Sequence, residues 1–339
     1  MKKRATMQDI ANETGLSTAS VSYVLNGKDG VSEDRRILVM DAVKKLGYVS
    51  NYAARSLAMN SSKLIGVCSP QTEQKNKLMF DNPFYSELMN NIEFECRQKG
   101  YHVIISGTDI DESYMNLAQK RSLDGIIIIG SYSEEFYKDF QNSNFPVVLI
   151  DTYFDSNEFS NVRIDDEEGG YISAKYLLER GHRSIAFVSG MITDCGVTQR
   201  RFEGYKRALS DFSVAFDENN VYSGSVSFAY GREQAKNIVE SNNNITAIMC
   251  TADVIAVGAS KQLSDMGVKI PDGISIIGFD NLKISKYTSP SITTVSQNIE
   301  EKGKIAVEMI LSQIESDKKI GKTVVLPVEI VERKSVKRL

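Results

Sequence analysis

The chain has 339 residues, enough for a small domain and a larger two-lobed one, and its 42% hydrophobic and 25% charged residues are typical of a soluble globular protein. The longest aliphatic run, Ile126–Ile129, is far shorter than a membrane span, and no apolar secretory segment follows the basic N-terminus. We therefore expect a cytoplasmic protein without a membrane partner. The four cysteines form no close pair and there are two histidines, so neither a disulfide framework nor a metal site is predicted.

Charge is distributed unevenly along the chain. Residues 1–60 hold nine lysines and arginines against six acidic residues, which gives this segment a charge of +3. The whole chain carries −4, so the remaining residues carry −7. A basic head on an acidic body is typical of a protein whose smaller part binds nucleic-acid phosphates.

Three short helices are predicted in the head. Thr6 and Asp9 have the spacing of a capping box, which indicates that the first helix begins directly after Thr6. Gly15 ends this helix, and Ser17 caps the second one. Ser32 caps a third helix that ends at Gly47. The predicted inner faces are Met7, Ile10 and Ala11 in the first helix, Val21, Val24 and Leu25 in the second, and Ile37, Met40, Val43 and Leu46 in the third.

A tight glycine-containing turn joins the first two helices, so the segment of about residues 7–26 has the helix-turn-helix pattern. In that motif, side chains at the start of the second helix face base edges in the major groove of DNA. The candidate base contacts are Ser17, Thr18, Ala19, Ser22 and Tyr23. A three-helix bundle without a role in DNA binding is the alternative interpretation.

At this point the sequence resembles a known family. The runs Thr6–Ala11, Leu16–Gly27, Leu46–Tyr48 and Asn51–Leu57 are similar to the lac-repressor/gal-repressor (LacI/GalR) family of transcriptional regulators. The resemblance implies a homodimer that reads a near-palindromic operator and responds to a small effector. It also implies further DNA contacts at Thr6, Asn26, Tyr48, Arg55 and Leu57.

The resemblance further implies that residues 50–58 form a hinge helix, which folds when two copies meet on operator DNA. Alanines and Leu57 favour a helix here, although one this short is marginal alone. Leu57 would wedge between bases in the minor groove and kink the duplex, with Arg55 near the phosphates or the groove. Tyr23 and Ser50 depart from the family pattern, which commonly has Arg and Pro at these positions. The operator sequence of the family is therefore not assumed.

From Lys63 onwards, strand-like runs alternate with amphipathic helical stretches, which predicts an α/β body with two parallel, doubly wound sheets covered on both faces. Predicted strands span residues 64–67, 103–106, 125–129, 147–150, 184–188, 247–250 and 275–278. Predicted helices span residues 84–99, 169–180, 200–209, 231–241, 254–266 and 300–314.

The resemblance continues through motifs such as Glu179–Ile185, Arg201–Tyr205 and Ile277–Asn281. It implies a periplasmic-binding-protein-like body whose chain crosses between two lobes three times. Residues 1–59 would form the DNA-binding domain with its hinge, and residues 60–339 the effector-binding and dimerisation body. Within the body, the expected ranges are about 61–161 and 293–324 for lobe one, and about 162–292 and 325–339 for lobe two.

Ligands of doubly wound folds bind at the carboxyl ends of strands, here in the cleft between the lobes. The positions that match effector contacts in the family are Phe84, Tyr85, Asp151, Arg201, Asp253, Asp280 and Gln297. An arginine and a carboxylate that converge there can grip vicinal hydroxyls or a ligand carboxylate, while a purely structural Arg–Asp pair is the alternative. Val226 stands where some sugar-binding relatives place a stacking aromatic, so the effector, a sugar or related metabolite, stays undefined.

Two other classes of function remain as alternatives. A non-regulatory small-molecule binding protein of the same fold would need a signal peptide and no head, and an enzyme would need a nucleophile, base or metal constellation. His182 lies between a helix and a strand and matches a structural position. The acidic run Asp165–Glu168 suits a helix start better than a cation site. We therefore expect no catalytic residue, cofactor or metal, and favour a dimeric repressor, since no tetramerisation heptad follows Arg333.

Overall fold

The structure is a computed structural model in which the chain divides into two compact units, Met1–Ser62 and Lys63–Leu339. The described residues are 5–25, 30–48, 61–69, 81–107, 114–130, 132, 134–141, 143–154, 158–193, 196–241, 244–316, 318–319 and 321–339. The hinge predicted at residues 50–58 lies outside the described residues, as do the predicted DNA contacts Asn26, Arg55 and Leu57.

The first unit contains three helices, α1 (Met7–Thr14), α2 (Thr18–Leu25) and α3 (Glu33–Leu46). The capping box at the start of α1 is confirmed, because the Thr6 amide donates to Asp9 Oδ2 at 2.8 Å and the Asp9 amide donates to Thr6 Oγ1 at 3.3 Å. Gly15 ends α1 with a φ of 67°, a left-handed conformation that glycine adopts without strain. At α2, the Ser20 amide donates to Ser17 Oγ at 3.2 Å, as predicted for a cap.

The inner face of α3 differs from the prediction. Ile37 and Met40 are exposed, with 54% and 45% of their surface accessible, and the buried residues of this helix are Val39 and Ala42. Val43 and Leu46 pack partly against the core, so the stripe at 39, 42, 43 and 46 has helical spacing and the other two apolar side chains fall outside it. Ser32 occupies the N-cap position but forms no side-chain capping hydrogen bond.

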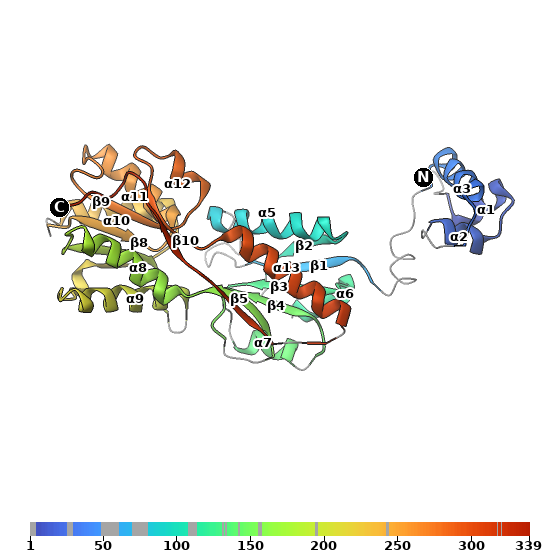
Figure 1. The fold of residues 1–339 in the computed structure, drawn as a ribbon, viewed down its shortest axis with the longest axis horizontal. Coiled ribbons are helices and arrows are strands. Elements are labelled where there is room, and N and C mark those ends of the chain that lie inside the picture. The colour runs from blue at the N-terminus through green and yellow to red at the C-terminus, as the bar shows by residue number, and fades with distance from the viewer. Residues whose placement is uncertain are drawn as a thin grey trace. The chain divides into compact units, whose positions relative to one another are not determined.

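The second unit is built on two sheets, which Figure 1 shows as two lobes with helices on either side of each sheet. The first sheet is parallel throughout, in the order β11-β5-β4-β3-β1-β2. Its strands are β1 (Leu64–Cys68), β2 (His102–Ser106), β3 (Gly125–Ile129), β4 (Val147–Ile150), β5 (Ser160–Ile164) and β11 (Thr323–Leu326).

The second sheet has the order β12-β10-β9-β8-β6-β7 and is parallel except at β12, which pairs antiparallel with β10. Its strands are β6 (Ile185–Gly190), β7 (Val221–Gly224), β8 (Ala247–Cys250), β9 (Ser275–Asp280), β10 (Thr293–Ser296) and β12 (Glu329–Val331). The predicted α/β class with two doubly wound sheets is confirmed.

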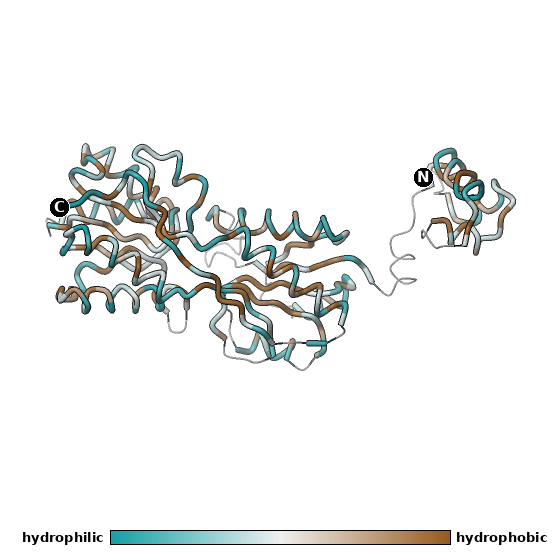
Figure 2. The backbone as a smooth tube through the Cα atoms, in the orientation of Figure 1, coloured by the Kyte–Doolittle hydropathy of each residue, from teal (hydrophilic) through white to brown (hydrophobic). Residues whose placement is uncertain are grey.

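Helices cover both faces of each sheet, and the strands between them are the most hydrophobic segments of the body (Figure 2). On the first sheet, α5 (Pro83–Gln98) and α13 (Ile299–Ser316) pack on one face, and α6 (Tyr114–Arg121) and α7 (Glu134–Gln141) on the other. On the second, α8 (Asp166–Glu179) and α9 (Val197–Asp211) pack opposite α10 (Phe228–Glu240) and α11 (Asp253–Asp265). A short 3₁₀ helix, η1 (Glu218–Asn220), and α12 (Lys283–Tyr287) complete the described elements.

The chain crosses between the sheets a few residues later than the sequence indicated. Strand β5 continues to Ile164, so the first crossing follows residue 164 rather than 161. Strand β10 belongs to the second sheet, which moves the second crossing from residue 292 to beyond Ser296. The third crossing follows Leu326 rather than residue 324. The backbone pairing of β5, β10 and β11 therefore sets these boundaries.

Glycines let neighbouring helices of the second lobe approach until their backbones touch. A Cβ on Gly170 of α8 would lie 2.1 Å from the Arg201 carbonyl oxygen, and one on Gly204 of α9 would lie 2.0 Å from the Glu167 carbonyl oxygen. These distances are far below van der Waals contact and involve backbone, which cannot turn aside. The close contact fixes the start of α9, and with it Arg201, against α8.

We expect Gly204→Ala to lower the free energy of unfolding by about 1–3 kcal/mol, because the added methyl group must push α8 and α9 apart. Urea denaturation followed by circular dichroism measures this change. Ser210→Ala, at an exposed position of the same helix, is the matched control and should change stability by less than about 0.5 kcal/mol. Equal stability of Gly204→Ala and the natural chain would contradict the backbone contact.

Candidate functional site

A cavity of about 280 Å³ lies between the two lobes, at the carboxyl ends of strands from both sheets. Asp151 follows β4, Asp280 is the last residue of β9, and Gln297 directly follows β10. Six of the seven residues expected to contact an effector line this cavity: Phe84, Tyr85, Asp151, Arg201, Asp280 and Gln297. The structure thus brings together, from segments far apart in the sequence, most of the residues that the resemblance singled out.

The first lobe supplies an aromatic wall to the cavity. Asn82 caps α5 by accepting a hydrogen bond from the Phe84 amide at 3.1 Å, and this places Phe84 and Tyr85 in the first turn of the helix. Their rings meet edge to face at a centroid distance of 5.2 Å. Both rings line the cavity and also pack on the core of the lobe. The two aromatic side chains therefore belong both to the cavity wall and to the hydrophobic core of the first lobe.

Arg201 lies at the cavity, but its guanidinium is paired with Asp166 rather than with Asp280. Its Nε and Nη2 each lie 2.8 Å from Asp166 Oδ1, and its Nη1 donates to the Thr251 carbonyl oxygen at 2.7 Å. The guanidinium also lies over the Phe279 ring, 3.7 Å from its centroid. The acidic run that the sequence assigned to a helix start thus includes a residue with a second role: Asp165 caps α8, while Asp166 holds the arginine of the cavity.

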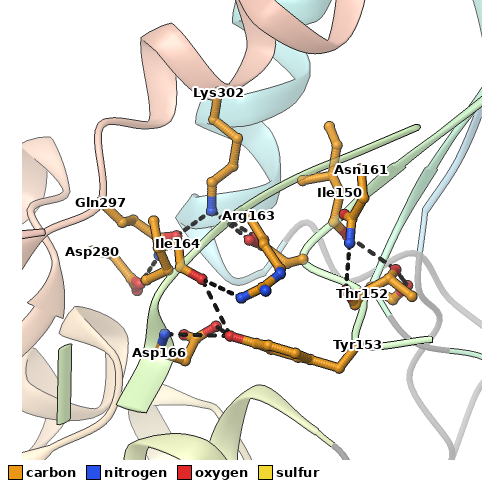
Figure 3. A network of polar contacts seen from close by, with 12 residues as sticks. Ile150, Thr152, Tyr153, Asn161, Arg163, Ile164, Asp166, Asp280, Gln297 and Lys302 are labelled. Carbon is orange, nitrogen blue, oxygen red and sulfur yellow. Dashed lines mark hydrogen bonds and ion pairs between the residues drawn. The ribbon is translucent and has the colours of Figure 1, made fainter. Parts of the chain in front are cut away.

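A chain of polar contacts connects the two carboxylates of the cavity. The Lys302 ammonium donates to Asp151 Oδ1 and Oδ2 at 2.6 and 2.8 Å and also to the amide oxygen of Gln297. The amide nitrogen of Gln297 donates to Asp280 Oδ1 at 2.6 Å. Figure 3 shows Lys302 reaching from its helix towards Gln297, with Asp280 on the far side of the amide. Lys302 itself is fully buried and does not line the cavity.

A second contact between the lobes involves Tyr153, which follows β4 in the first lobe. Its hydroxyl donates to Asp166 Oδ2 at 2.7 Å and accepts from the Asp166 amide at 3.3 Å (Figure 3). The Arg200 guanidinium lies 3.9 Å from the centroid of the Tyr153 ring. Asp166 therefore bridges Arg201 of the second lobe and Tyr153 of the first.

Burial dominates the electrostatics of the site. It raises the pKa of Asp280 to about 7, although the Arg201 charge and the Gln297 amide oppose the rise. Burial also raises the pKa of Asp151, and the Lys302 ammonium opposes that rise. The backbone at both residues is strained as well, because Asp151 and Asp280 have positive φ angles of 55° and 109°, which non-glycine residues seldom adopt. Strained, buried, titratable groups are characteristic of functional sites.

Asp253, the seventh expected contact, does not line the cavity. It is fully buried, and its carboxylate accepts from the Leu282 amide at 2.8 Å and from Thr294 Oγ1 at 2.7 Å. A Cβ on Gly278 would lie 2.1 Å from Asp253 Oδ1, so the carboxylate fills the space above that glycine. These contacts assign Asp253 to the link between β9, β10 and α12 rather than to ligand contact.

The sequence interpretation missed Lys302 and Asp166. Lys302 could have been found, because it interrupts the buried stripe of α13 formed by Ile299, Ala306 and Ile310 at helical spacing. A charged side chain on the inner face of a helix needs a partner there, which is a sign of a buried polar site. Asp166 gave no comparable signal, since acidic residues are common in the first turn of any helix.

The start of α2 presents the candidate base contacts of the head. Ser17, Thr18 and Ala19 are exposed, Ser22 is half-buried, and Tyr23 has 49% of its surface accessible. Thr6 is exposed and engaged in its capping box, and Tyr48 packs partly against the core of the head. Ser17, Thr18 and Ala19 are therefore accessible at the amino end of α2.

His182 and three of the cysteines are buried in the body of the protein. His182 is buried, with Nδ1 2.9 Å from Thr246 Oγ1 and Nε2 3.3 Å from the Lys337 carbonyl oxygen, and burial lowers its pKa. Cys68, Cys96 and Cys250 are buried free thiols. Within the described ranges, no group of three or more histidine, cysteine or acidic residues is placed to hold a metal ion. Nor is any described helix both long enough and apolar enough to traverse a bilayer.

A helix-turn-helix head, followed by a two-lobed body with a cavity between the lobes, defines a DNA-binding transcriptional regulator with an effector-binding domain. Comparison with known proteins agrees. The model of the family "Bacterial regulatory proteins, lacI family" matches residues 6–51, and that of the "Periplasmic binding protein-like domain" matches residues 174–336.

Among curated proteins, the chain is 33% identical to the HTH-type transcriptional repressor PurR of Vibrio atlanticus (strain LGP32) over 341 residues, 99% of each chain. It is 31% identical to PurR of Photorhabdus laumondii, over 98% of this chain and 97% of the relative. The chain therefore belongs to the lacI family of bacterial regulatory proteins.

Two solved structures illustrate the fold. The lac repressor dimer bound to operator and the anti-inducer ONPF aligns with a TM-score of 0.83 and 23% identity, over 99% of this chain and 100% of the other. A LacI family transcriptional regulator from Enterococcus faecium with bound ribose aligns with a TM-score of 0.71 and 27% identity, over 81% of this chain and 99% of the other.

We expect Asp253→Asn to make the stability of the protein less dependent on pH. Burial, reinforced by the nearby Asp280 charge, raises the pKa of Asp253 to about 8, against about 3.9 for an aspartate in an unfolded chain. Between these two pKa values the folded state binds more protons than the unfolded state does. The stability of the folded state therefore falls as the pH rises from about 4 through 8. The amide variant lacks this contribution, and Thr294 Oγ1 can accept from the new amide instead of donating.

Urea denaturation at about pH 5 and about pH 8 measures the effect. The loss of stability between these two values should be smaller in Asp253→Asn than in the natural chain. Asp265→Asn is the control, because its hydrogen bond with Lys261 lowers the pKa of that exposed carboxyl, away from this range. An unchanged pH dependence in Asp253→Asn would show that Asp253 does not take up a proton on folding.

Proposed function

We propose that the chain is a repressor that binds a near-palindromic operator as a homodimer, and that a small effector in the interlobe cavity changes its operator affinity. The observation that carries the proposal is the cavity itself, where Asp151 and Phe84 of one lobe face Arg201 and Asp280 of the other. A ligand that touches both lobes binds one angle between them better than another, and so shifts the equilibrium between conformations. The protein would act in the cytoplasm and without catalysis.

The size and lining of the cavity favour a small polar metabolite. Its volume of about 280 Å³ lies just below the usual range of ligand pockets, about 300–1,000 Å³, and suits a monosaccharide or a nucleobase. Two aromatic rings and Val226 supply apolar walls, and carboxylate and amide groups supply polar contacts. Ribose and cellobiose are bound in regulators of similar fold, and two similar repressors carry the name PurR.

The coupling between effector and operator would run through the hinge at residues 50–58. The effector would change the angle between the lobes, and with it the spacing of the two hinges in a dimer and the free energy needed to fold them on DNA. Linkage then requires that effector and operator change each other's affinity by the same factor. A titration in which the two ligands bind independently would rule this mechanism out.

Selection of bound sequences from a palindromic DNA pool, followed by gel retardation at low salt, tests the proposed function. The intact chain should retard the selected DNA, while residues 60–339 alone should not. Because phosphate contacts release counterions, the affinity should fall steeply as the salt concentration rises. Failure of the intact chain to retard any member of the pool would refute the proposal.

We expect Tyr23→Ala to weaken specific operator binding at least tenfold, since Tyr23 is the largest exposed side chain of α2 and would face the bases in the major groove. The slope of affinity against salt should stay nearly constant, because no phosphate-binding cation is lost. Retardation assays at several salt concentrations measure both quantities. Tyr171→Ala, in the body, is the matched control and should leave affinity and slope unchanged.

Asp280→Asn should abolish the response to an effector while operator binding is retained. The substitution keeps the size of the side chain but removes an acceptor from the cavity, and Asp280 lies outside the head. Arg201 is a poorer choice for this test, because its removal would leave Asp166 buried without its ion-pair partner. Ribose, cellobiose, hypoxanthine and guanine are first screened for a compound that alters operator binding by the natural chain. Retardation by Asp280→Asn is then measured with and without that compound. A full effector response in Asp280→Asn would contradict the site.

A further inference from the structure

Lys302 is the one buried lysine side chain with no accessible surface among the described residues, and it lies immediately behind the cavity wall. It projects from the inner face of α13, where Ile299 and Ala306 are the neighbouring buried residues. An ammonium group is stable in such surroundings only when its charge is compensated. Here Asp151 supplies the compensation with both carboxylate oxygens, at 2.6 and 2.8 Å.

The same ammonium group determines which way the Gln297 amide faces. Lysine can only donate hydrogen bonds, so the group of Gln297 in contact with Lys302 must be its oxygen. The amide nitrogen therefore faces Asp280, to which it donates at 2.6 Å. One lysine thus compensates the charge of Asp151 and sets the orientation of Gln297, and both of these residues line the cavity.

Arg201, which lines the cavity, and Lys302, which lies behind its wall, are each engaged by a protein carboxylate. Arg201 pairs with Asp166, and Lys302 pairs with Asp151. A ligand anion would have to displace one of these carboxylates and would also approach Asp280. An uncharged ring that carries hydroxyl groups can instead donate to the carboxylate oxygens, while its apolar face packs on Phe84 and Tyr85.

We propose that Lys302 is a positioning residue that sets the charge selectivity of the effector cavity: by neutralising Asp151 and orienting Gln297, it makes the cavity select an uncharged, hydroxyl-bearing ring and reject anions. The proposal rests on the proposed function of the cavity as an effector site. It assigns selectivity to a residue that has no contact with the cavity surface.

Matched sugars test the proposal by isothermal titration calorimetry. Three series are used, D-glucose, D-galactose and D-mannose, each with its 2-amino-2-deoxy form and its uronate, so that one position changes charge and the ring is kept. In the natural chain, at least one neutral hexose should bind, and its uronate should bind at least tenfold more weakly. A uronate that binds as tightly as its parent, or a chain that binds none of the nine sugars, overturns the assignment.

Two substitutions should shift the selectivity in opposite directions. Lys302→Met leaves Asp151 without its cation, so the affinity of the amino sugar relative to its parent should rise at least tenfold. Asp151→Asn leaves Lys302 without its anion, so the relative affinity of the uronate should rise at least tenfold. A loss of stability alone cannot produce opposite shifts in a ratio of affinities, and Asp151→Asn keeps the test decisive if Lys302→Met fails to fold.

Lys304→Met is the matched control. Lys304 lies on the same helix with 45% of its side chain accessible and pairs with Glu301 at 3.7 Å, so its removal should leave all ratios unchanged. Constant ratios in the substituted Lys302 and Asp151 chains overturn the proposal. None of these measurements involves DNA, so operator binding can persist when the selectivity proposal fails, and the two failures are distinguishable.

Discussion

Two buried cations hold the carboxylates at the place where the lobes meet. Removing a carboxylate from water costs several kcal/mol, and Asp151 and Asp166 are tolerated there because Lys302 and Arg201 each lie within 2.8 Å of them. Each pair joins segments far apart in the sequence, the end of β4 to α13 and the start of α8 to α9. The geometry of the cavity depends on these two pairs, because they fix the side chains that form its polar wall.

The fold of the backbone places the charged side chains at the cavity. Parallel strands of both sheets end at the same boundary, so the residues that follow β4, β8, β9 and β10 face one another without any special loop. The glycines of α8 and α9 bring those helices into backbone contact, which holds Arg201 against Asp166. Asp253, which does not line the cavity, also gives support, because its carboxylate connects α11 to the start of α12 and to β10 by hydrogen bonds. Rigid support of this kind is what a site needs to distinguish similar small ligands.

The sequence predicted most of the architecture, since long apolar runs such as Gly125–Ile129 and Ser275–Gly278 are buried strands of a doubly wound sheet. It missed β7, β11 and β12, which lie at or near sheet edges, are short, and are only partly buried. It also missed β5, whose Asn161 is buried with its side-chain amide donating to the Thr152 carbonyl oxygen, and β10, whose Thr293 and Thr294 are buried. Periodicity detects burial of apolar side chains and gives little signal where polar side chains are buried with partners.

The same limit applies to the site. Six of the seven predicted contact positions line the cavity, because residues at strand ends are placed by topology. The pairing of charges was not predictable, since Arg201 could have met Asp280 as easily as Asp166 and only the packing of α8 on α9 decides between them. Asp253 also comes soon after a buried strand, but it lies at the start of a helix, where Thr294 and the Leu282 amide engage it.

The three crossings between the lobes also affect how the protein responds to proteases. Each lobe is assembled from separate stretches of sequence, so neither can be released as one continuous fragment. A single cut in one crossing leaves two intact connections and a shared core that includes Phe279 and Leu282 alongside first-lobe residues. A chain nicked there would stay assembled under native conditions and could still bind its ligand, although a denaturing gel would show it in two pieces.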